Sequence, residues 1–246
     1  MIKFFRKIRK SLIQENKMGK YFKYAIGEII LVVIGILIAL QINNWNQNRL
    51  DRKKEMTYLS ELQTSLKKDI EKINNVLGFN VKKDSIVLGL MGIFKSELNN
   101  EQRFELIEKY STPFTSYEFF TPNSTTWDNL IASENINLIK DKNLRIKLME
   151  YYNPNYEGSI QERIKTMNRK VIDENFPKFF TREYTKKNLN LDTELPTLRD
   201  FALHHDQKLL SDLFGIRYLI NMQNGFLEDT KSHIQSLIKV IDQQKQ

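Results

Sequence analysis

The sequence predicts an all-α fold class, in which an N-terminal transmembrane helix continues into an external antiparallel helical bundle with a long C-terminal helix. Three observations predict it. One apolar run of eighteen residues lies near the N-terminus, and apolar side chains elsewhere recur at alternating steps of three and four. Glycine and proline are few, at 9 and 5 of 246 residues, and 41% of the residues are apolar, enough to form a packed core.

The apolar run extends from Ala25 to Ile42 and, at ~1.5 Å rise per residue, is about 27 Å long, close to the thickness of a bilayer's hydrocarbon core. Its two polar interruptions, Glu28 and Gln41, fall within one turn of either end, where a side chain reaches the headgroups. The aromatic residues predicted to lie at the two membrane interfaces are Tyr21, Tyr24 and Trp45.

The distribution of charge predicts the orientation of this helix. Residues 1–24 carry eight basic side chains and one acidic one, whereas the remaining 222 residues carry 30 basic and 29 acidic groups. Because lysine and arginine resist translocation, we expect a single-pass protein of the inner membrane with a cytoplasmic N-terminus and a periplasmic C-terminal domain. A nearly neutral folded domain also argues against nucleic acid as a partner, despite the net charge of +8.

Two other interpretations of the apolar run stay open. A cleaved secretory signal also has a basic stretch before an apolar one, but no small-x-small pattern follows Ala39. A core helix of a soluble protein would lack the flanking aromatic and basic residues. The preceding residues 1–24 form either a basic amphipathic helix on the inner leaflet or a plain positively charged tag.

Two stretches resemble a known family. KFFRKIR followed by ENKMGKYFKYAIGEIILVVIGILIALQINNWN is similar to the opening of a family of uncharacterised bacterial membrane proteins, defined only as a domain of unknown function. TWDNLIASENINLIKDKNLRIKLMEYY, from Thr126, is similar to that family's central segment, and together the matching stretches cover roughly a third of the chain. The resemblance implies a single-span Gram-negative membrane protein with an external helical domain, and it implies no activity, ligand or catalytic residue.

We predict three regions: the cytoplasmic segment 1–24, the transmembrane helix 25–42 and the external domain 43–246. In the external domain, apolar residues from Leu59 to Leu77 follow helical spacing, which predicts a helix over 45–77 continuous with the span. Gly78, and later Gly89 with Gly92, are predicted bends or ends, and a second helix is expected over 81–98.

The middle of the chain is predicted to alternate loops and short helices. Residues 111–126 contain two prolines and many hydroxyl side chains, which indicates a long loop. Ser124 or Thr125 is expected to cap a helix that begins at Thr126, and further helices are expected over 141–152 and from Ile160 to about Pro177, with a polar linker over 185–197.

The C-terminal region has the longest periodic pattern. From Leu209 to Ile241, the positions alternate steps of four and three, and all but Gln223 and Thr230 are apolar. Such a seam needs a partner of similar length, and the helix over 45–77 is the expected one in an antiparallel bundle. Pairing between two copies of the chain is the alternative.

Candidate site residues are few. The loop's aromatic residues either form a binding surface or cover the end of the bundle. Glu28, an acid inside the span, either anchors the helix at the interface or contacts a partner. The aromatic candidates are Phe114, Tyr117, Phe119, Phe120 and Trp127.

The chain contains three histidines that could take part in catalysis or metal binding. His204, His205 and Asp206, near Asp200, are weak candidates for a metal site, and the alternative is a polar start of a helix. Asp229 and His233 form an i, i+4 pair with the same two interpretations. The sequence contains no cysteine and no phosphate-binding, dinucleotide-binding, zinc-protease or nucleophile-elbow motif, so we expect no metal and no cofactor.

These observations favour a membrane-anchored, non-enzymatic interaction or scaffold module of the cell envelope. Its expected partners are the lipid bilayer and either another envelope protein or a second copy of the chain. An envelope enzyme with an unrecognised, metal-assisted site is the first alternative. A one-span receptor is the second, and it would need a partner for output because about 24 residues on the cytoplasmic side cannot form a domain.

Overall fold

A computed structural model describes residues 18–153, 159–197, 199 and 202–245, and these residues form helices and loops with no strand. The all-α prediction is confirmed. The predicted amphipathic segment falls mostly on residues 1–17, which lie outside the described residues. The described helices, in chain order, are α2 (Met18–Met91), η1 (Gly92–Phe94), α3 (Asn100–Phe114), α4 (Thr125–Ala132), η2 (Asn135–Leu138), α5 (Lys142–Tyr152), α6 (Ile160–Phe179), α7 (Arg182–Leu189), η3 (Leu203–His205) and α9 (Gln207–Lys245).

The chain divides into two compact units, with the boundary between Thr57 and Tyr58. In the first unit, the described residues belong to the N-terminal part of α2. This is the one helix among the described residues that is long and apolar enough to cross a membrane. Its large apolar side chains from Ile26 to Ile42 are all exposed, as expected of a segment whose covering is lipid and not protein.

Helix α2 continues past the first two predicted breaks, Gly78 and Gly89, and ends at Met91, next to the third, Gly92. The predicted bend at Gly78 and the separate helix over 81–98 are both wrong, because α2 continues through Gly78 to Met91. A glycine costs a helix only about 1 kcal/mol relative to alanine. Burial of Ile73, Val87 and Leu90 on the same helix face offsets that cost.

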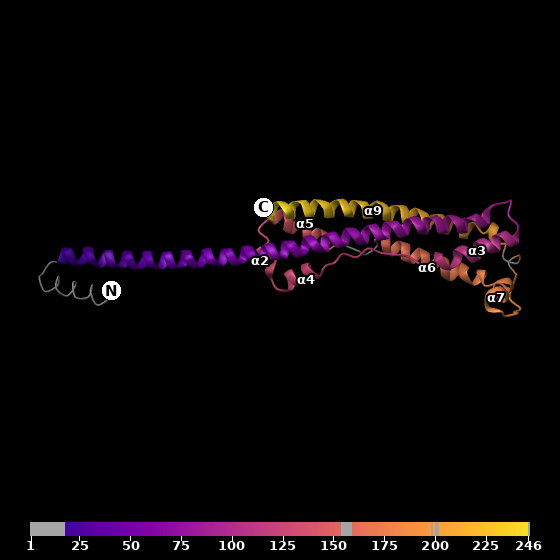
Figure 1. Cartoon of the computed structure of the whole chain (residues 1–246), viewed down its shortest axis with the longest axis horizontal. Coiled ribbons are helices and arrows are strands. Elements are labelled where there is room, and N and C mark those ends of the chain that lie inside the picture. The colour runs from indigo at the N-terminus through magenta and orange to yellow at the C-terminus, as the bar shows by residue number, and fades with distance from the viewer. Residues whose placement is uncertain (1–17, 154–158, 198, 200–201, 246) are drawn as a thin grey trace. The chain divides into compact units, whose positions relative to one another are not determined.

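Helix α9 pairs with the part of α2 that belongs to the second unit, and the two run antiparallel (Figure 1). Three contacts define the register: Gln63 donates to Asp242 at 2.6 Å, Asn80 to Gln223 at 2.9 Å, and Arg217 to Asp84 at 2.6 Å. The predicted antiparallel pairing within the chain is confirmed, although the contacts extend beyond the predicted partner helix. The seam residues buried on α9 are Leu209, Leu213, Ile216, Ile220, Gln223, Leu227, Ile234, Leu237 and Ile241.

Helices α3 and α6 complete the bundle at the start of α9, and α6 packs along α9. Gly89 of α2 allows the close approach of α3, because a Cβ atom there would overlap the ring of Tyr110. The apolar core of this half includes Val87, Leu90, Ile93, Ile107, Phe114, Val171, Phe179, Leu203, Leu209, Leu213, Ile216 and Ile220.

Helices α4 and α5 pack near the end of α9 (Figure 1). Helix α5 follows the prediction, since Asp141 caps it by accepting hydrogen bonds from the amides of Asn143 and Leu144. The predicted loop over 111–126 is shorter than expected, because α3 extends to Phe114 and α4 begins at Thr125. The predicted linker over 185–197 starts inside α7.

Candidate functional site

Residues 115–124 join α3 to α4 as an extended segment, and buried polar side chains hold its backbone. Lys83 of α2 donates to the carbonyl oxygens of Phe114 and, at 2.9 Å, Ser116. Asn168 of α6 donates to the Thr115 carbonyl oxygen at 3.1 Å. These contacts satisfy carbonyl groups that the end of α3 leaves without helical partners.

The rest of the 115–124 segment is held in the same way. Gln161 of α6 accepts from the Phe120 amide at 2.8 Å and donates to the Phe120 carbonyl oxygen at 3.0 Å. Gln223 of α9 donates to the Glu118 carbonyl oxygen at 3.3 Å, and Asp69 of α2 accepts from the Asn123 amide at 2.9 Å. The polar residues of the core therefore serve a strand-like segment that has no sheet to pair with.

Two of these groups have shifted pKa values. Burial lowers the pKa of the Lys83 ammonium to about 7, and no carboxylate among the described residues forms an ion pair with it. Burial also raises the pKa of the Asp69 carboxyl above its ordinary value, against hydrogen bonds from Tyr151 and Asn123 that lower it.

The aromatic residues predicted for the loop separate into two groups. Phe114, Phe120 and Trp127 are buried, so they contribute to packing of the bundle. Tyr117 is 40% exposed, and its ring contacts the half-buried Phe119 with 5.0 Å between centroids. Of the five, Phe120 is the one that lines a pocket.

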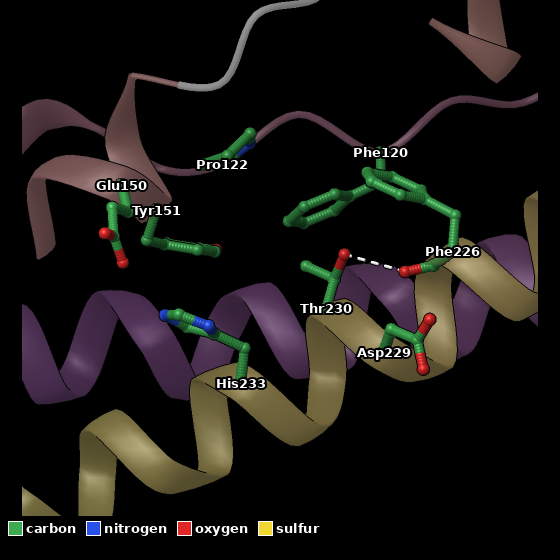
Figure 2. A pocket seen from close by; sticks show the side chains of 8 residues that line it. All are labelled: Phe120, Pro122, Glu150, Tyr151, Phe226, Asp229, Thr230 and His233. Atoms are coloured by element: carbon green, nitrogen blue, oxygen red, sulfur yellow. Dashed lines mark hydrogen bonds between the residues drawn. The ribbon is translucent and has the colours of Figure 1, made fainter. Parts of the chain in front are cut away.

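This pocket, the α5–α9 pocket, encloses about 410 Å³ between α5, α9 and the 115–124 segment (Figure 2). Its volume falls in the usual range for small-ligand sites, about 300–1,000 Å³. The surface is mostly apolar, with polar groups supplied by α5 and α9. Its lining residues are Phe120, Pro122, Glu150, Tyr151, Phe226, Asp229, Thr230 and His233.

Tyr151 forms one wall and is held from behind. Its hydroxyl donates to the Asp69 carboxylate at 2.9 Å, and Asp69 is fully buried. Its ring stacks over the imidazole of His233, with 6.3 Å between centroids (Figure 2). It also packs in an edge arrangement with the ring of Tyr152, with 4.7 Å between centroids. A side chain fixed at both its ring and its hydroxyl gives the pocket a preformed wall.

Helix α9 supplies the opposite wall through one face. Phe226, Asp229, Thr230 and His233 stand at positions i, i+3, i+4 and i+7, which align on a helix. The Thr230 hydroxyl donates to the Phe226 carbonyl oxygen at 2.8 Å, so it is occupied within its own helix (Figure 2). The His233 Nε2 atom is buried and has no hydrogen-bond partner among the described residues.

The two carboxylates of the pocket come from different elements, Glu150 from α5 and Asp229 from α9 (Figure 2). Both residues are exposed. Within the part of the chain that the structure describes, neither carboxylate takes part in an ion pair or a side-chain hydrogen bond. Both are therefore available to a ligand.

A row of exposed apolar side chains runs along α9 from the pocket. It begins at Phe226, which also lines the pocket, and it repeats every four residues. Every member is at least 36% exposed, and the row consists of Leu210, Phe214, Tyr218, Met222 and Phe226.

At the start of α9, Asp206 has a structural role. Asp206 caps α9 by accepting from the Leu209 amide at 2.9 Å, and it pairs with Lys178 at 2.9 Å. The rings of His204 and His205 lie 4.0 Å apart between centroids. Asp200 lies outside the described residues, and the described residues contain no group of three or more histidines and carboxylates that could hold a metal ion.

The residues predicted for the membrane interface lie in the first unit. Tyr24 and Trp45 are exposed, and the Arg49 guanidinium lies 5.7 Å from the centre of the Trp45 ring. Glu28 is partly exposed on α2. The Tyr21 side chain lies outside the described part of the chain.

A comparison with protein-family profiles matches residues 28–192 to a family of unknown function, DUF6090. The match covers about two thirds of the 246 residues. The chain belongs to the DUF6090 family. The resemblance inferred from the sequence, to a family defined only as a domain of unknown function, is therefore confirmed. Searches of curated proteins and of solved structures found no match to this DUF6090 chain.

The DUF6090 match includes one wall of the α5–α9 pocket and ends before the other. Phe120, Pro122, Glu150 and Tyr151 fall within residues 28–192, whereas the α9 residues follow it. Sequence reasoning identified Phe120 and the Asp229–His233 pair but missed Glu150 and Tyr151. The helical spacing of Phe226 and Asp229, three residues apart, could have indicated that both lie on one face of α9. No local pattern in the sequence connects α5 to that face of α9.

Proposed function

We propose that this DUF6090 chain is a single-span protein of the inner membrane with a cytoplasmic N-terminus, and that residues 58–246 form an extracytoplasmic, non-enzymatic binding module. The basic residues before the apolar helix support the orientation, since eight of them precede it. The exposed apolar side chains of the helix support anchoring rather than burial in a soluble core.

One observation carries the binding role: the α5–α9 pocket combines a fixed aromatic wall with carboxylates that have no partner among the described residues. A well-formed apolar pocket with a few converging polar groups is the default location for a ligand-binding site. Several polar core residues, in contrast, bind the backbone of the 115–124 segment. The pocket is therefore a feature of the module that these packing contacts do not explain.

The topology is tested with C-terminal fusions in intact cells. We expect a C-terminal alkaline phosphatase fusion to be active and a fluorescent-protein fusion that matures only in the cytoplasm to be dark. An inactive phosphatase with a fluorescent counterpart would reverse the orientation.

The binding role is tested without assuming a ligand. A photoreactive residue replaces Thr230 on the pocket wall, and the matched control places it at Leu189 of α7, which is 54% exposed. We expect irradiation of intact cells to give a discrete adduct at position 230 and none at 189, resolved by gel mobility and intact mass. The same pattern at both positions, or no adduct at either, would refute a binding role for the pocket.

A further inference from the structure

We propose that the α5–α9 pocket binds an aliphatic ammonium group, that is, a positively charged nitrogen on a compact hydrocarbon. The inference rests on the proposed function, because it names the ligand class of the same site. The first argument is charge. The described lining residues include two carboxylates, Glu150 and Asp229, and no lysine or arginine.

The aromatic residues supply the second argument. The rings of Phe120, Tyr151 and Phe226 all line the pocket (Figure 2). The electron-rich face of an aromatic ring attracts a cation, and quaternary and methylated ammonium groups are recognised by several such rings together. The Tyr151 ring needs little ordering on binding, since Asp69 and His233 already hold it.

The third argument comes from the classes of ligand that the pocket disfavours. A carboxylate or phosphate would meet the carboxylates of Glu150 and Asp229, and the described lining residues supply no lysine or arginine, only the imidazole of His233. A neutral hydrocarbon would use the rings but leave both carboxylates without a counterion. An ammonium group on a short alkyl chain uses the rings and the carboxylates together.

This chemistry has two sources, a free amine or the side chain of a lysine. Two probes represent them. Choline represents a free quaternary amine, and lysine acetylated at its α-amino group and converted to the methylamide, which keeps its side-chain ammonium, represents a lysine side chain. The neutral isostere of choline, in which carbon replaces the quaternary nitrogen, matches its shape without its charge. Binding to full-length protein in detergent is followed by saturation-transfer nuclear magnetic resonance, with protein-free micelles subtracted.

We expect a cationic probe to bind and the neutral isostere to bind at least about tenfold more weakly. Glu150→Gln and Asp229→Asn should each weaken binding of the cation by about two- to fivefold, because each removes one exposed attraction. The control Glu71→Gln, which removes an exposed acidic charge of α2 outside the pocket, should leave binding unchanged. Tighter binding of choline would indicate a free amine, and tighter binding of the lysine probe a basic protein side chain.

Equal binding of choline and its isostere would overturn the ammonium assignment, as would an unchanged affinity in the Glu150→Gln, Asp229→Asn double variant. The adduct at position 230 distinguishes failure of the ammonium assignment from failure of the proposed binding role. If that adduct forms but neither cation binds, the ammonium assignment is wrong and the binding module stands. If both fail, the pocket has no binding role.

Discussion

Lys83 is the residue whose environment departs furthest from what its type suggests. Its side chain is 3% exposed, and its ammonium lies 4.2 Å from the centre of the Phe114 ring. It donates to the Phe114 and Ser116 carbonyl oxygens and, at 3.1 Å, to Asn168. A buried ammonium without a counterion among the described residues is costly. The hydrogen bonds of Lys83 offset part of this cost and attach the end of α3 to α2.

The lowered pKa of Lys83 predicts a dependence of stability on pH. Its pKa is about 7 in the folded protein and 10.5 as a free side chain, so between these values the unfolded chain binds more protons. The free energy of unfolding should therefore rise from pH 7.5 to 9.5, by up to about 1.4 kcal/mol per pH unit. Urea denaturation of the full-length protein in detergent, repeated across this pH range, measures the free energy of unfolding. The Lys83→Met variant should lose this rise, and a variant that retained it would exclude Lys83 as the cause.

Gly89 and Gly78 form a matched pair on α2. Alanine at position 89 would place a Cβ atom against the Tyr110 ring, whereas alanine at 78 meets no atom. We expect Gly89→Ala to lower the free energy of unfolding by about 1–3 kcal/mol. Gly78→Ala should raise it by about 0.5–1 kcal/mol, because glycine is a poorer helix former. Denaturation midpoints compare the two, and equal effects would contradict the packing of α3 on Gly89.

At the scale of elements, the 115–124 segment explains the burial of several polar side chains of the bundle, including Asp69, Gln161 and Gln223. A helix satisfies its own backbone, but an extended segment needs partners for every buried amide and carbonyl group. Helices α2, α6 and α9 each supply one or more of them, through Asp69, Gln161 and Gln223. The segment therefore ties three helices together without a sheet.

Gln161 is the sharpest test of that arrangement, since it binds both the amide and the carbonyl group of Phe120. Gln161→Ala should lower the free energy of unfolding by about 1–3 kcal/mol, because two buried groups lose their partners. The Phe120 amide should also lose protection from hydrogen exchange, measured by mass spectrometry. Gln235→Ala, on the exposed face of α9, is the control and should change neither value. Unaltered exchange in Gln161→Ala would contradict the assigned role.

At the scale of the whole molecule, the two units have opposite relations to solvent. The described first unit exposes its apolar side chains, whereas the second unit buries its own in a helical core. An exposed apolar run such as Ile29 to Ile42 is costly in water and has the length of a membrane span. The proposed membrane anchor therefore belongs to the first unit, whereas the second unit has a core of its own.

This contrast predicts the effect of charge in the apolar run. Ile34→Lys combined with Leu37→Lys places two charges near the middle of the segment, each costing about 2.5–3.5 kcal/mol for membrane insertion. We expect the double variant to shift from the carbonate-resistant membrane pellet to the supernatant. Leu50→Lys, at an exposed position beyond the run, should remain in the pellet. A double variant that stayed fully membrane-bound would argue against a single span at 25–42.

The sequence by itself determined the features that depend on local periodicity and composition. The helical class, the apolar segment, the helix over 141–152 and the seam from Leu209 to Ile241 all follow from residues close together in the chain. Even Gln223, an exception in that seam, was visible as an anomaly, although its partner was not. Local patterns report which face of a helix is apolar because helical spacing is fixed.

The tertiary structure alone decided where α2 ends and what the polar core residues do. Gly78 looked like a break because glycine weakens helices, but long-range burial along α2 outweighed that weakness. Glu150 and Tyr151 joined the face of α9 that carries Asp229 only through packing of elements almost eighty residues apart. No local pattern encodes such a meeting, because a pocket is defined by which surfaces the fold brings together.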